Sequence, residues 1–292
     1  MLQFIVCVFL SCLPVTLHGA HKTSESFIVK DKKLSFPKPG YYSFDHGYWI
    51  GDHAPELSVL EFAEIIADNP DIEEIDFSTY EHKEKIDRHF ISVILLLKNI
   101  RVLNLLGCGL MDTDIEMLSQ LSSIRVLKIS QSSTSTLTSA CFDHVSKMKL
   151  LTELHIHSNM GVTDADVEKI STLSQLQVLS LNSARFNAKL TGQACEYLAR
   201  LTNLTHLDLK NRHYDFSYSH LKKLSSLKHL KVLNFFNKKS YQETKGNDSV
   251  QLESLSSNLF DYLSTDWCGP IGDLLEFITF MRQEMPNLET LG

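Results

Sequence analysis

The side chains best spaced to do chemistry are Glu153, His155 and His157. Along an extended strand, alternation would place all three on one face. Imidazole and carboxylate groups bind zinc, but a zinc site needs three or four converging ligands. The positions that we expect beside them on the neighbouring strands are poor ligands: Lys128, Ser130, Ser180 and Asn182. We therefore expect no metal site and interpret the two histidines as polar contacts in a binding surface.

A second candidate is the tetrapeptide Trp267-Cys268-Gly269-Pro270, which resembles the active-site turn of thioredoxin. A thiol at a helix start would have a lowered pKa, because the free amides there favour the thiolate. However, Ile271 stands where the resolving cysteine would be, and the residues that follow cannot complete a thioredoxin sheet. No nucleophile elbow, phosphate-binding glycine loop or HExxH motif occurs in the sequence. We predict a protein that is not an enzyme and needs no cofactor.

The elements that position these residues follow from an internal repeat. Seven segments open with an aliphatic residue, two variable residues, an aliphatic, one variable and then an aliphatic or Phe. The steps between openings are 28, 24, 27, 25, 28 and 26 residues, and the openings are Ile72, Ile100, Ile124, Leu151, Leu176, Leu204 and Leu230. Tyr262, three residues after Leu259, makes a degenerate eighth strand, and Leu288 with Leu291 begins a ninth. Self-similarity at this period predicts a solenoid.

The pattern resembles leucine-rich repeat proteins, and the resemblance covers residues 58–292. It implies an α/β fold: a curved horseshoe of about eight repeats and a truncated ninth strand, with a parallel concave sheet and convex helices. Thr113-Asp114-Ile115-Glu116 and Thr163-Asp164-Ala165-Asp166 have the spacing of helix-start capping boxes. These starts resemble the ribonuclease-inhibitor-like and cysteine-containing subclasses. Such a fold implies recognition of a protein ligand.

One position departs from the family pattern. Three residues after the last strand aliphatic, such proteins place Asn or Cys, and only Cys108 and Asn159 conform here; the other five are Tyr80, Ser132, Ala184, Arg212 and Lys238. We therefore expect a weak polar ladder between turns. We also expect a mobile loop over Ser130–Ser139, which is rich in Ser and Thr.

The concave face is the predicted binding surface, because the variable strand residues point there. Val102, Val126, Val178 and Val232 occupy the first exposed position of four strands, where valine also simply favours strand formation. A mixed polar and apolar curved surface suits a protein better than a small molecule. The predicted contact residues are Asp76, Asn104, Leu106, Lys128, His155, His157, Ser180, Asn182, Asp208, Lys210, Asn234 and Phe236.

Residues 1–20 have the layout of a secretory signal peptide, with an apolar run from Leu2 to Leu13 that is too short to span a bilayer. The run lacks a basic start, and His18 occupies a position that prefers a small residue. We predict secretion, with a cytoplasmic location as the alternative. The cysteines that would remain are dispersed over four repeats, as in intracellular proteins: Cys108, Cys141, Cys195 and Cys268. Candidate N-glycosylation sites are Asn203 and Asn247.

Residues 21–57 precede the repeats and are rich in aromatic residues, glycine and proline. We predict an N-terminal cap over the first repeat, since a solenoid needs its apolar ends covered. An aromatic binding patch is the alternative. At the other end, the ninth strand is expected to leave an uncapped edge, which invites self-association.

Charge is unevenly distributed within a net total of −7. Eleven acidic residues and no Lys or Arg lie between Pro39 and His82, whereas six lysines and no acid lie between Phe216 and Gln242. Solvated helix faces explain most such runs. The alternative is steering of a partner or head-to-tail association between ends of opposite charge. The acidic total and the short basic stretch disfavour nucleic acid as a partner.

Two functional hypotheses follow. The first is a secreted module that binds a protein through the concave face. The second is an intracellular adaptor, because the repeats resemble those of F-box and Zyg-type substrate receptors of cullin ubiquitin ligases, which use openings like Pro286-Asn287-Leu288. No F-box or cullin-contacting helix pair is recognisable before the repeats.

Overall fold

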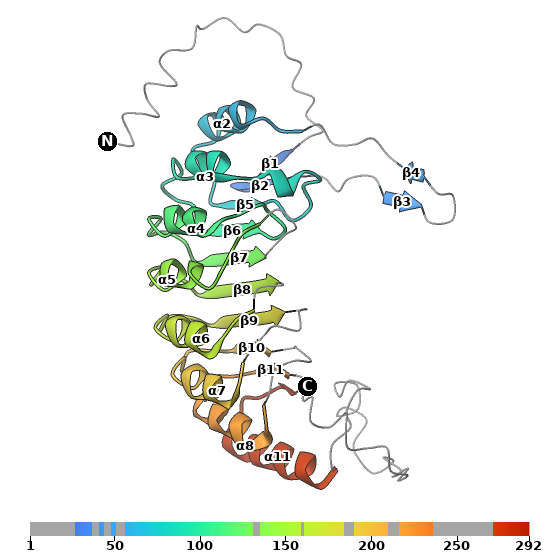
Figure 1. Ribbon diagram of the computed structural model, residues 1–292, viewed down its shortest axis with the longest axis vertical. Helices are drawn as coiled ribbons and strands as arrows, with labels where there is room; N and C mark the ends of the chain where they lie inside the picture. The colour runs from blue at the N-terminus through green and yellow to red at the C-terminus, as the bar shows by residue number, and fades with distance from the viewer. Residues whose placement is uncertain are drawn as a thin grey trace, which may run out of the picture.

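The protein is an open horseshoe with its strands on one side and its helices on the other. The computed structural model describes residues 27–36, 41–43, 48–50, 56–130, 135–158, 161–183, 190–209, 216–235 and 271–291. Ten strands form one sheet in the order β1-β2-β5-β6-β7-β8-β9-β10-β11-β12. All neighbours from β2 to β12 pair in parallel, while β1 and β2 are antiparallel. Figure 1 shows the helices stacked along the outer curve, so the predicted leucine-rich repeat architecture is confirmed.

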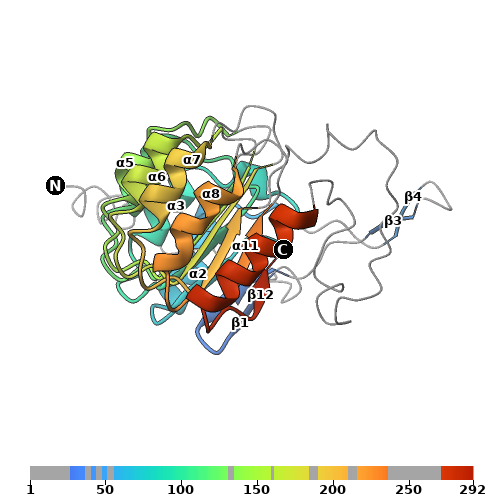
Figure 2. The same cartoon turned by 90° about the horizontal axis from the view of Figure 1, so that it is seen from below.

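The elements are short, as the repeat length requires. The strands are β1 (Ile28–Lys30), β2 (Lys33–Ser35), β3 (Tyr41–Ser43), β4 (Tyr48–Ile50), β5 (Glu74–Asp76), β6 (Val102–Leu105), β7 (Val126–Ser130), β8 (Glu153–Ser158), β9 (Val178–Ser183), β10 (His206–Leu209), β11 (Val232–Phe235) and β12 (Thr290–Leu291). The helices are α2 (Val59–Asp68), η1 (Lys83–Lys85), α3 (Arg88–Ile94), α4 (Asp112–Leu118), α5 (Cys141–Val145), α6 (Asp164–Ile170), α7 (Gly192–Leu198), α8 (Tyr218–Leu221), η2 (Lys222–Ser226) and α11 (Ile271–Glu284). The view from below in Figure 2 shows the helices grouped on one side of the sheet.

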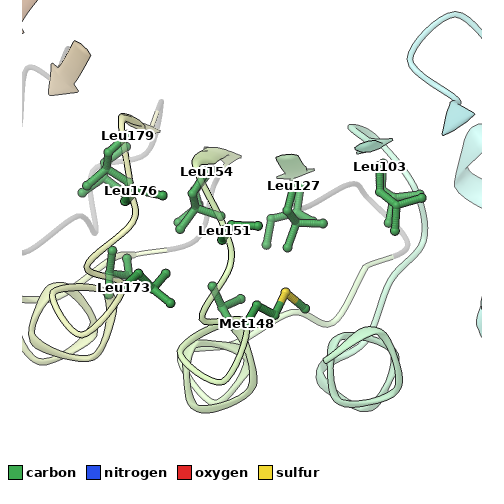
Figure 3. Close-up of a cluster of buried hydrophobic side chains, with 14 of the residues drawn as sticks. Leu103, Leu127, Met148, Leu151, Leu154, Leu173, Leu176 and Leu179 are labelled. Atoms are coloured by element: carbon green, nitrogen blue, oxygen red, sulfur yellow. The ribbon is translucent and has the colours of Figure 1, made fainter. Parts of the chain in front are cut away.

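The core is a set of aliphatic ladders that run from repeat to repeat. At the second position of β2 and of β5 to β11, one fully buried residue pairs in register with the next: Leu34, Ile75, Leu103, Leu127, Leu154, Leu179, Leu207 and Leu233. Figure 3 shows Leu103, Leu127, Leu154 and Leu179 side by side above the helix layer. No single repeat can bury such a residue alone, so adjacent repeats stabilise each other.

A second ladder uses only the backbone. The carbonyl oxygen of the residue just before each strand accepts two amides of the following repeat. The Arg125 oxygen, for example, accepts from Thr152 at 2.7 Å and from Glu153 at 3.0 Å. The same pattern holds for the oxygens of Lys32, Glu73, Arg101, Thr152, Gln177 and Thr205. These bonds need no particular side chain, so the repeats can stack without a regular row of Asn or Cys.

The structure describes two of the seven residues that were expected to form a weak polar ladder between turns. Tyr80 is buried and its hydroxyl accepts from the Leu57 amide at 2.7 Å, and Cys108 is buried as an apolar residue. The equivalent residues of the other five repeats lie outside the described residues.

The expectation of a mobile loop over Ser130–Ser139 is wrong for residues 135–139. Ser135 donates to the Leu110 carbonyl at 2.7 Å, and the Ser139 hydroxyl donates to Asp166 at 2.9 Å. Polar residue type suggested a solvated loop, whereas these hydroxyls cross-link three repeats.

Carboxylates at helix starts make further bonds between repeats. Asp112 accepts from the Thr138 amide at 2.8 Å and from its hydroxyl at 2.6 Å. Asp164 accepts from the Thr191 amide at 2.9 Å and hydroxyl at 2.6 Å. A carboxylate is favoured at the positive end of a helix, and charge-assisted bonds are stronger than neutral ones. These contacts fix the spacing of successive helices.

The N-terminal hairpin extends the sheet beyond the first repeat. Asp31 and Lys32 form a two-residue turn with φ of 51° and 62°, which is the conformation that tight hairpins need. β2 then pairs in parallel with β5. Phe36 packs on Phe77 and Tyr80, with ring centroids 5.1 and 4.7 Å apart. β3 and β4 form a separate two-stranded sheet.

The C-terminal end differs from the predicted order of strands. β12 pairs directly with β11, through Val232 with Thr290 and Leu233 with Leu291. No strand therefore separates β11 from β12, and the segment Leu259–Tyr262, where an eighth strand was expected, lies outside the described residues. Helix α11 precedes β12 and packs against α8 and η2. Phe277 stacks on Tyr218 with ring centroids 4.9 Å apart.

One of the two predicted capping boxes is confirmed and the other is wrong. Thr163 caps α6, and its amide and hydroxyl donate to Asp166 at 2.9 and 2.8 Å. In α4 the capping residue is Met111, whose amide donates to Asp114 at 2.8 Å. The helix thus begins two residues earlier than Thr113 would place it. Asp114 is fully buried, and its Oδ1 has no hydrogen-bond partner within the described structure.

This contrast predicts that Met111→Thr stabilises the protein. The new hydroxyl would donate to Asp114 and accept from its amide, as Thr163 does for Asp166. Gaining a helix cap contributes about 0.5–2 kcal/mol, and the 37% exposure of Met111 limits the apolar burial that the substitution removes. Denaturant unfolding should show a higher midpoint. The reciprocal Thr163→Met should lose a similar amount, and a Met111→Thr protein no more stable than its parent would contradict this interpretation.

Candidate functional site

The strand register brings the predicted central concave residues into one unbroken row. Adjacent members are direct partners on neighbouring strands, from β5 to β11. The row, named here the polar row, consists of Asp76, Asn104, Lys128, His155, Ser180, Asp208 and Asn234. Ser180 is buried and the other six are half-buried. Because their strand neighbours on either side point into the aliphatic core, these seven side chains face away from the helices.

A second row runs parallel to the polar row at the starts of the strands. It contains the four predicted valines and three charged or titratable residues, in the order Glu74, Val102, Val126, Glu153, Val178, His206 and Val232. The valines remain half-buried. The concave face therefore combines the polar row with a second row in which four valines are interspersed with charged or titratable residues, and protein-binding surfaces are commonly mixed in this way.

At the N-terminal side, the hairpin neutralises the acidic residues of this face. Lys33 on β2 lies 2.5 Å from a Glu74 oxygen and 3.6 Å from an Asp76 oxygen. Asp76 also accepts the Ser78 amide at 2.9 Å. Asn104 makes a similar local turn, accepting the Leu106 amide at 3.4 Å. These two members of the polar row are thus partly engaged within the protein.

The centre of the face carries its positive charge. Lys128 lies between Asn104 and His155 in the polar row, and within the described residues no carboxylate forms an ion pair with it. His155 Nε2 is 3.6 Å from a Glu153 oxygen, and it is buried without a hydrogen bond in the part of the chain that the structure describes. The exposed His157 ring lies edge-on to that of His155, with centroids 6.1 Å apart.

The environment of His155 favours the neutral imidazole. Burial lowers the pKa of His155, and the Lys128 ammonium lowers it further, while Glu153 opposes both effects. Among the described residues, no group of three or more His, Cys, Asp or Glu side chains could hold a metal ion.

Next to this centre, the turn after β6 is fixed tightly. Gly107 has a φ of +82°, and its amide donates to the Ser130 hydroxyl at 2.6 Å. A Cβ on Gly107 would lie 2.7 Å from Lys83 Cε, so the lysine side chain would have to move, and the positive φ disfavours any residue other than glycine. Leu106, a predicted contact residue, is half-buried in this turn.

Several predicted residues cannot be placed. Lys210, Phe236 and Asn247 lie outside the described residues, and for Asn182 only the backbone, opposite His157 in β9, is described. Asn203 is exposed, but its Nδ2, the atom that would carry a glycan, donates to the Ser174 carbonyl at 2.8 Å.

The expectation of a basic C-terminal end is wrong for its described part. Lys222 pairs with Glu276 at 2.7 Å, Lys228 with Glu284 at 3.4 Å and Lys231 with Glu289 at 3.2 Å. Lys223 pairs with Glu196 of α7 at 2.5 Å. The charge run was considered along the sequence, whereas the last repeat folds its acidic residues back onto it. These ion pairs offset the positive charge on which the head-to-tail alternative depends, within the described residues.

The described cysteines are buried and unbridged: Cys108, Cys141 and Cys195. Burial raises the pKa of Cys195 to about 12 and raises the pKa of the other two thiols as well. They serve as small apolar residues of the core. Among the described helices, none has both the length and the apolar character needed to cross a bilayer.

Sequence reasoning missed the contribution of β2 to this face. Lys33 and Ser35 pair with Glu74 and Asp76, yet the hairpin carries no leucine-rich step that could have indicated it. The charges alone offered a signal, since Lys30, Lys32 and Lys33 precede the acidic run.

Comparisons with known proteins bear on the fold. No family model matches the chain, and no curated protein sequence does. Among solved structures, internalin C2 of Listeria monocytogenes str. 4b F2365 is 15% identical with a TM-score of 0.37, covering 64% of this chain and 75% of that one. An internalin (inlF) of the same strain is 15% identical with a TM-score of 0.37, covering 59% of this chain and 52% of that one.

A third structure is the leucine-rich repeat ectodomain of the Arabidopsis receptor kinase HAESA, solved with a peptide hormone ligand. It is 16% identical with a TM-score of 0.38, covering 60% of this chain and 32% of that one. This chain thus spans about half of the second internalin and a third of the HAESA ectodomain. At such identities and TM-scores, the functional conclusions below rest on the protein's own geometry.

The pKa of His155 predicts a pH effect on stability. Because it is lowered in the folded state, the unfolded chain binds more protons below its own imidazole pKa of about 6.5. Stability should therefore fall as pH decreases below about 6.5, until the folded imidazole also titrates. Denaturant unfolding at about pH 7.5 and about pH 5 should show a smaller difference for His155→Gln than for the parent. The control is His206→Gln on the exposed start of β10; an unchanged pH difference in His155→Gln would contradict this assignment.

Proposed function

We propose that this leucine-rich repeat solenoid is a non-catalytic recognition protein that binds a protein ligand on its concave face. The observation that carries the proposal is the polar row beside the apolar strip of Val102, Val126, Val178 and Val232. The polar row runs across seven consecutive strands, and the valines lie beside it on four of them, β6, β7, β9 and β11. A surface of this length and mixed character fits an extended partner better than a small molecule, which a closed pocket would hold.

The rigidity of the scaffold supports the same proposal. Every strand that carries the polar row is fixed by the buried aliphatic ladder on its other face and by paired amides at its start. The contact side chains are therefore held on regular elements before a partner arrives. Preorganisation of this kind lowers the entropic cost of binding.

We propose secretion as the location, on the basis of the apolar leader at residues 1–20. One structural observation favours the alternative, an intracellular adaptor or cullin-type substrate receptor. Cys108, Cys141 and Cys195 are buried and unbridged, as is usual for proteins kept in a reducing compartment.

We infer that self-association through the C-terminal edge is secondary to recognition on the concave face. β12 is the last strand of the described sheet and is paired on one side. It contains two residues, so it offers few backbone groups to a second copy.

Site-specific photo-crosslinking tests the proposal. A photoreactive residue in place of Asn104, in the polar row, should give protein adducts in the cells or tissue that make the protein. The same residue in place of Glu168, an exposed position of α6, is the matched control on the convex side. Defined adducts from position 168 with none from position 104 would contradict concave recognition.

The same tagged protein reports its location. For a secreted protein, we expect it in the medium with a mature N-terminus near residue 21. Retention in the cytoplasm with residues 1–20 intact would replace secretion by the adaptor alternative, and the crosslinking result would still decide which face binds.

A further inference from the structure

Within the described residues, the centre of the concave face carries a positive charge, that of Lys128, with which no carboxylate forms an ion pair. Lys128 is the only lysine or arginine within strands β5 to β11. On β2, Lys33 is held by Glu74 and Asp76, and Lys30 lies on the edge strand β1. In the polar row the partners of Lys128 on both sides are uncharged amide and imidazole groups. Within the described residues, its ammonium group therefore has no counter-ion.

Two histidines adjoin this lysine. His155 is its direct partner on β8, and His157 is two residues further along the same strand, opposite Ser130. His155 Nε2 is buried without a hydrogen bond in the described structure, a condition that carries a free-energy cost until a partner supplies one. The hydroxyl-bearing Ser180 follows His155 in the polar row.

From this arrangement we propose that Lys128, His155 and His157 form a binding site for the carboxylate of one Asp or Glu in an extended peptide segment of the partner. The inference rests on the proposed function, since it concerns the same face. A carboxylate here would pair with the ammonium of Lys128 and accept from a protonated imidazole. Such charge-assisted bonds are stronger than neutral ones.

The surroundings select a single carboxylate over a polyanion. Asp76 and Asp208 lie in the polar row two strands away on either side, at about 10 Å given the usual strand spacing. Glu153 lies beside His155 on the same strand. Glu153 and Asp208 would repel a second and third negative charge, whereas Lys33 offsets the charge of Asp76. The neighbouring valines favour apolar residues next to the acidic one, so the ligand class is a mixed apolar and acidic peptide.

The site should also respond to pH. The charged and titratable groups facing His155 are Lys128 from β7 and Glu153 and His157 from β8; the described side chains of β9 beside it, Val178 and Ser180, do not titrate. A bound carboxylate stabilises the imidazolium form, so binding takes up protons and tightens as pH falls.

Peptide display followed by a double-mutant cycle tests the proposal. Random dodecapeptides are selected on the full-length protein at about pH 6, where Asp and Glu side chains of the peptides are ionised. Selected peptides should contain one recurrent Asp or Glu. Replacing that residue by Asn or Gln should weaken binding to the parent by about tenfold, as expected for a charge-assisted contact of about 1.4 kcal/mol.

Two variants isolate the site. Lys128→Met keeps the aliphatic stem and removes the charge, so the acidic peptide and its amide form should then bind with nearly equal affinity. Lys128→Glu should prefer a peptide with Lys at that position. Lys98→Glu makes the same change at an exposed turn away from the sheet, and it should preserve the parent's preference. Between about pH 7.5 and about pH 6, tightening should be smaller in His155→Gln than in the parent.

Three outcomes would overturn the inference. Suppose that Asn104→Arg weakens peptide binding, but that the acidic residue contributes equally to binding by the parent and by Lys128→Met. The peptide then binds the concave face, and the assignment of a carboxylate site to Lys128 is wrong. If no concave substitution affects binding, both proposals fall. If phosphoserine in place of the acidic residue binds more than tenfold tighter, the occupant is a phosphate and the assignment to a carboxylate is wrong.

Discussion

The fold depends on one constraint, which is that each strand must bury its aliphatic residue against those of the next repeat. Leu103, Leu127, Leu154 and Leu179 are fully buried and lie in register on adjacent strands. Full burial of a leucine contributes about 1.5–3 kcal/mol, and a repeat standing alone would leave part of that surface in water. Once these residues point inward, strand alternation forces their neighbours onto the concave face. The composition of the concave face is thus a geometric consequence of the core.

Backbone hydrogen bonds also hold neighbouring repeats together, and they place no requirement on the side chains. The paired amides at each strand start, as at the Arg125 and Thr152 carbonyls, make the same bonds whatever the side chain. The residues between the core positions can therefore vary among repeats. In this protein that freedom is used unevenly, with ion pairs at both ends of the sheet and an unpaired lysine near its middle.

Much of the fold could be predicted from the sequence, because the spacing of aliphatic residues directly reports which side chains are buried. The polar row from Asp76 to Asn234 follows from that spacing alone, and the register places all its members together. The order of the last strands could not be predicted, because the step from Leu230 to Leu288 is twice the repeat length and fits either one strand or two. Strand β2 contains no leucine-rich step, so the repeat pattern could not predict its pairing with β5.

Side-chain pairing was the least predictable layer. The capping motif that begins at Thr113 resembles the one that begins at Thr163. In the structure, however, the Met111 amide donates to Asp114, so the cap of α4 lies two residues before Thr113. The lysines near residue 228 looked like a basic surface, but Glu276, Glu284 and Glu289 return to them from a distant part of the chain. Such pairings depend on which elements pack together in the fold. A local sequence pattern does not predict that packing.

The aliphatic ladder stabilises the fold, and the polar row is left available for binding. The most direct measurement compares the unfolding free energy of Leu154→Ala with that of a triple variant, Asn104→Ser, Lys128→Ser and His157→Ser. The account predicts a loss of about 2–5 kcal/mol for Leu154→Ala, as for buried leucines in general, and a change of about 0.5 kcal/mol per site or less for the triple variant. A triple variant as unstable as Leu154→Ala would contradict it.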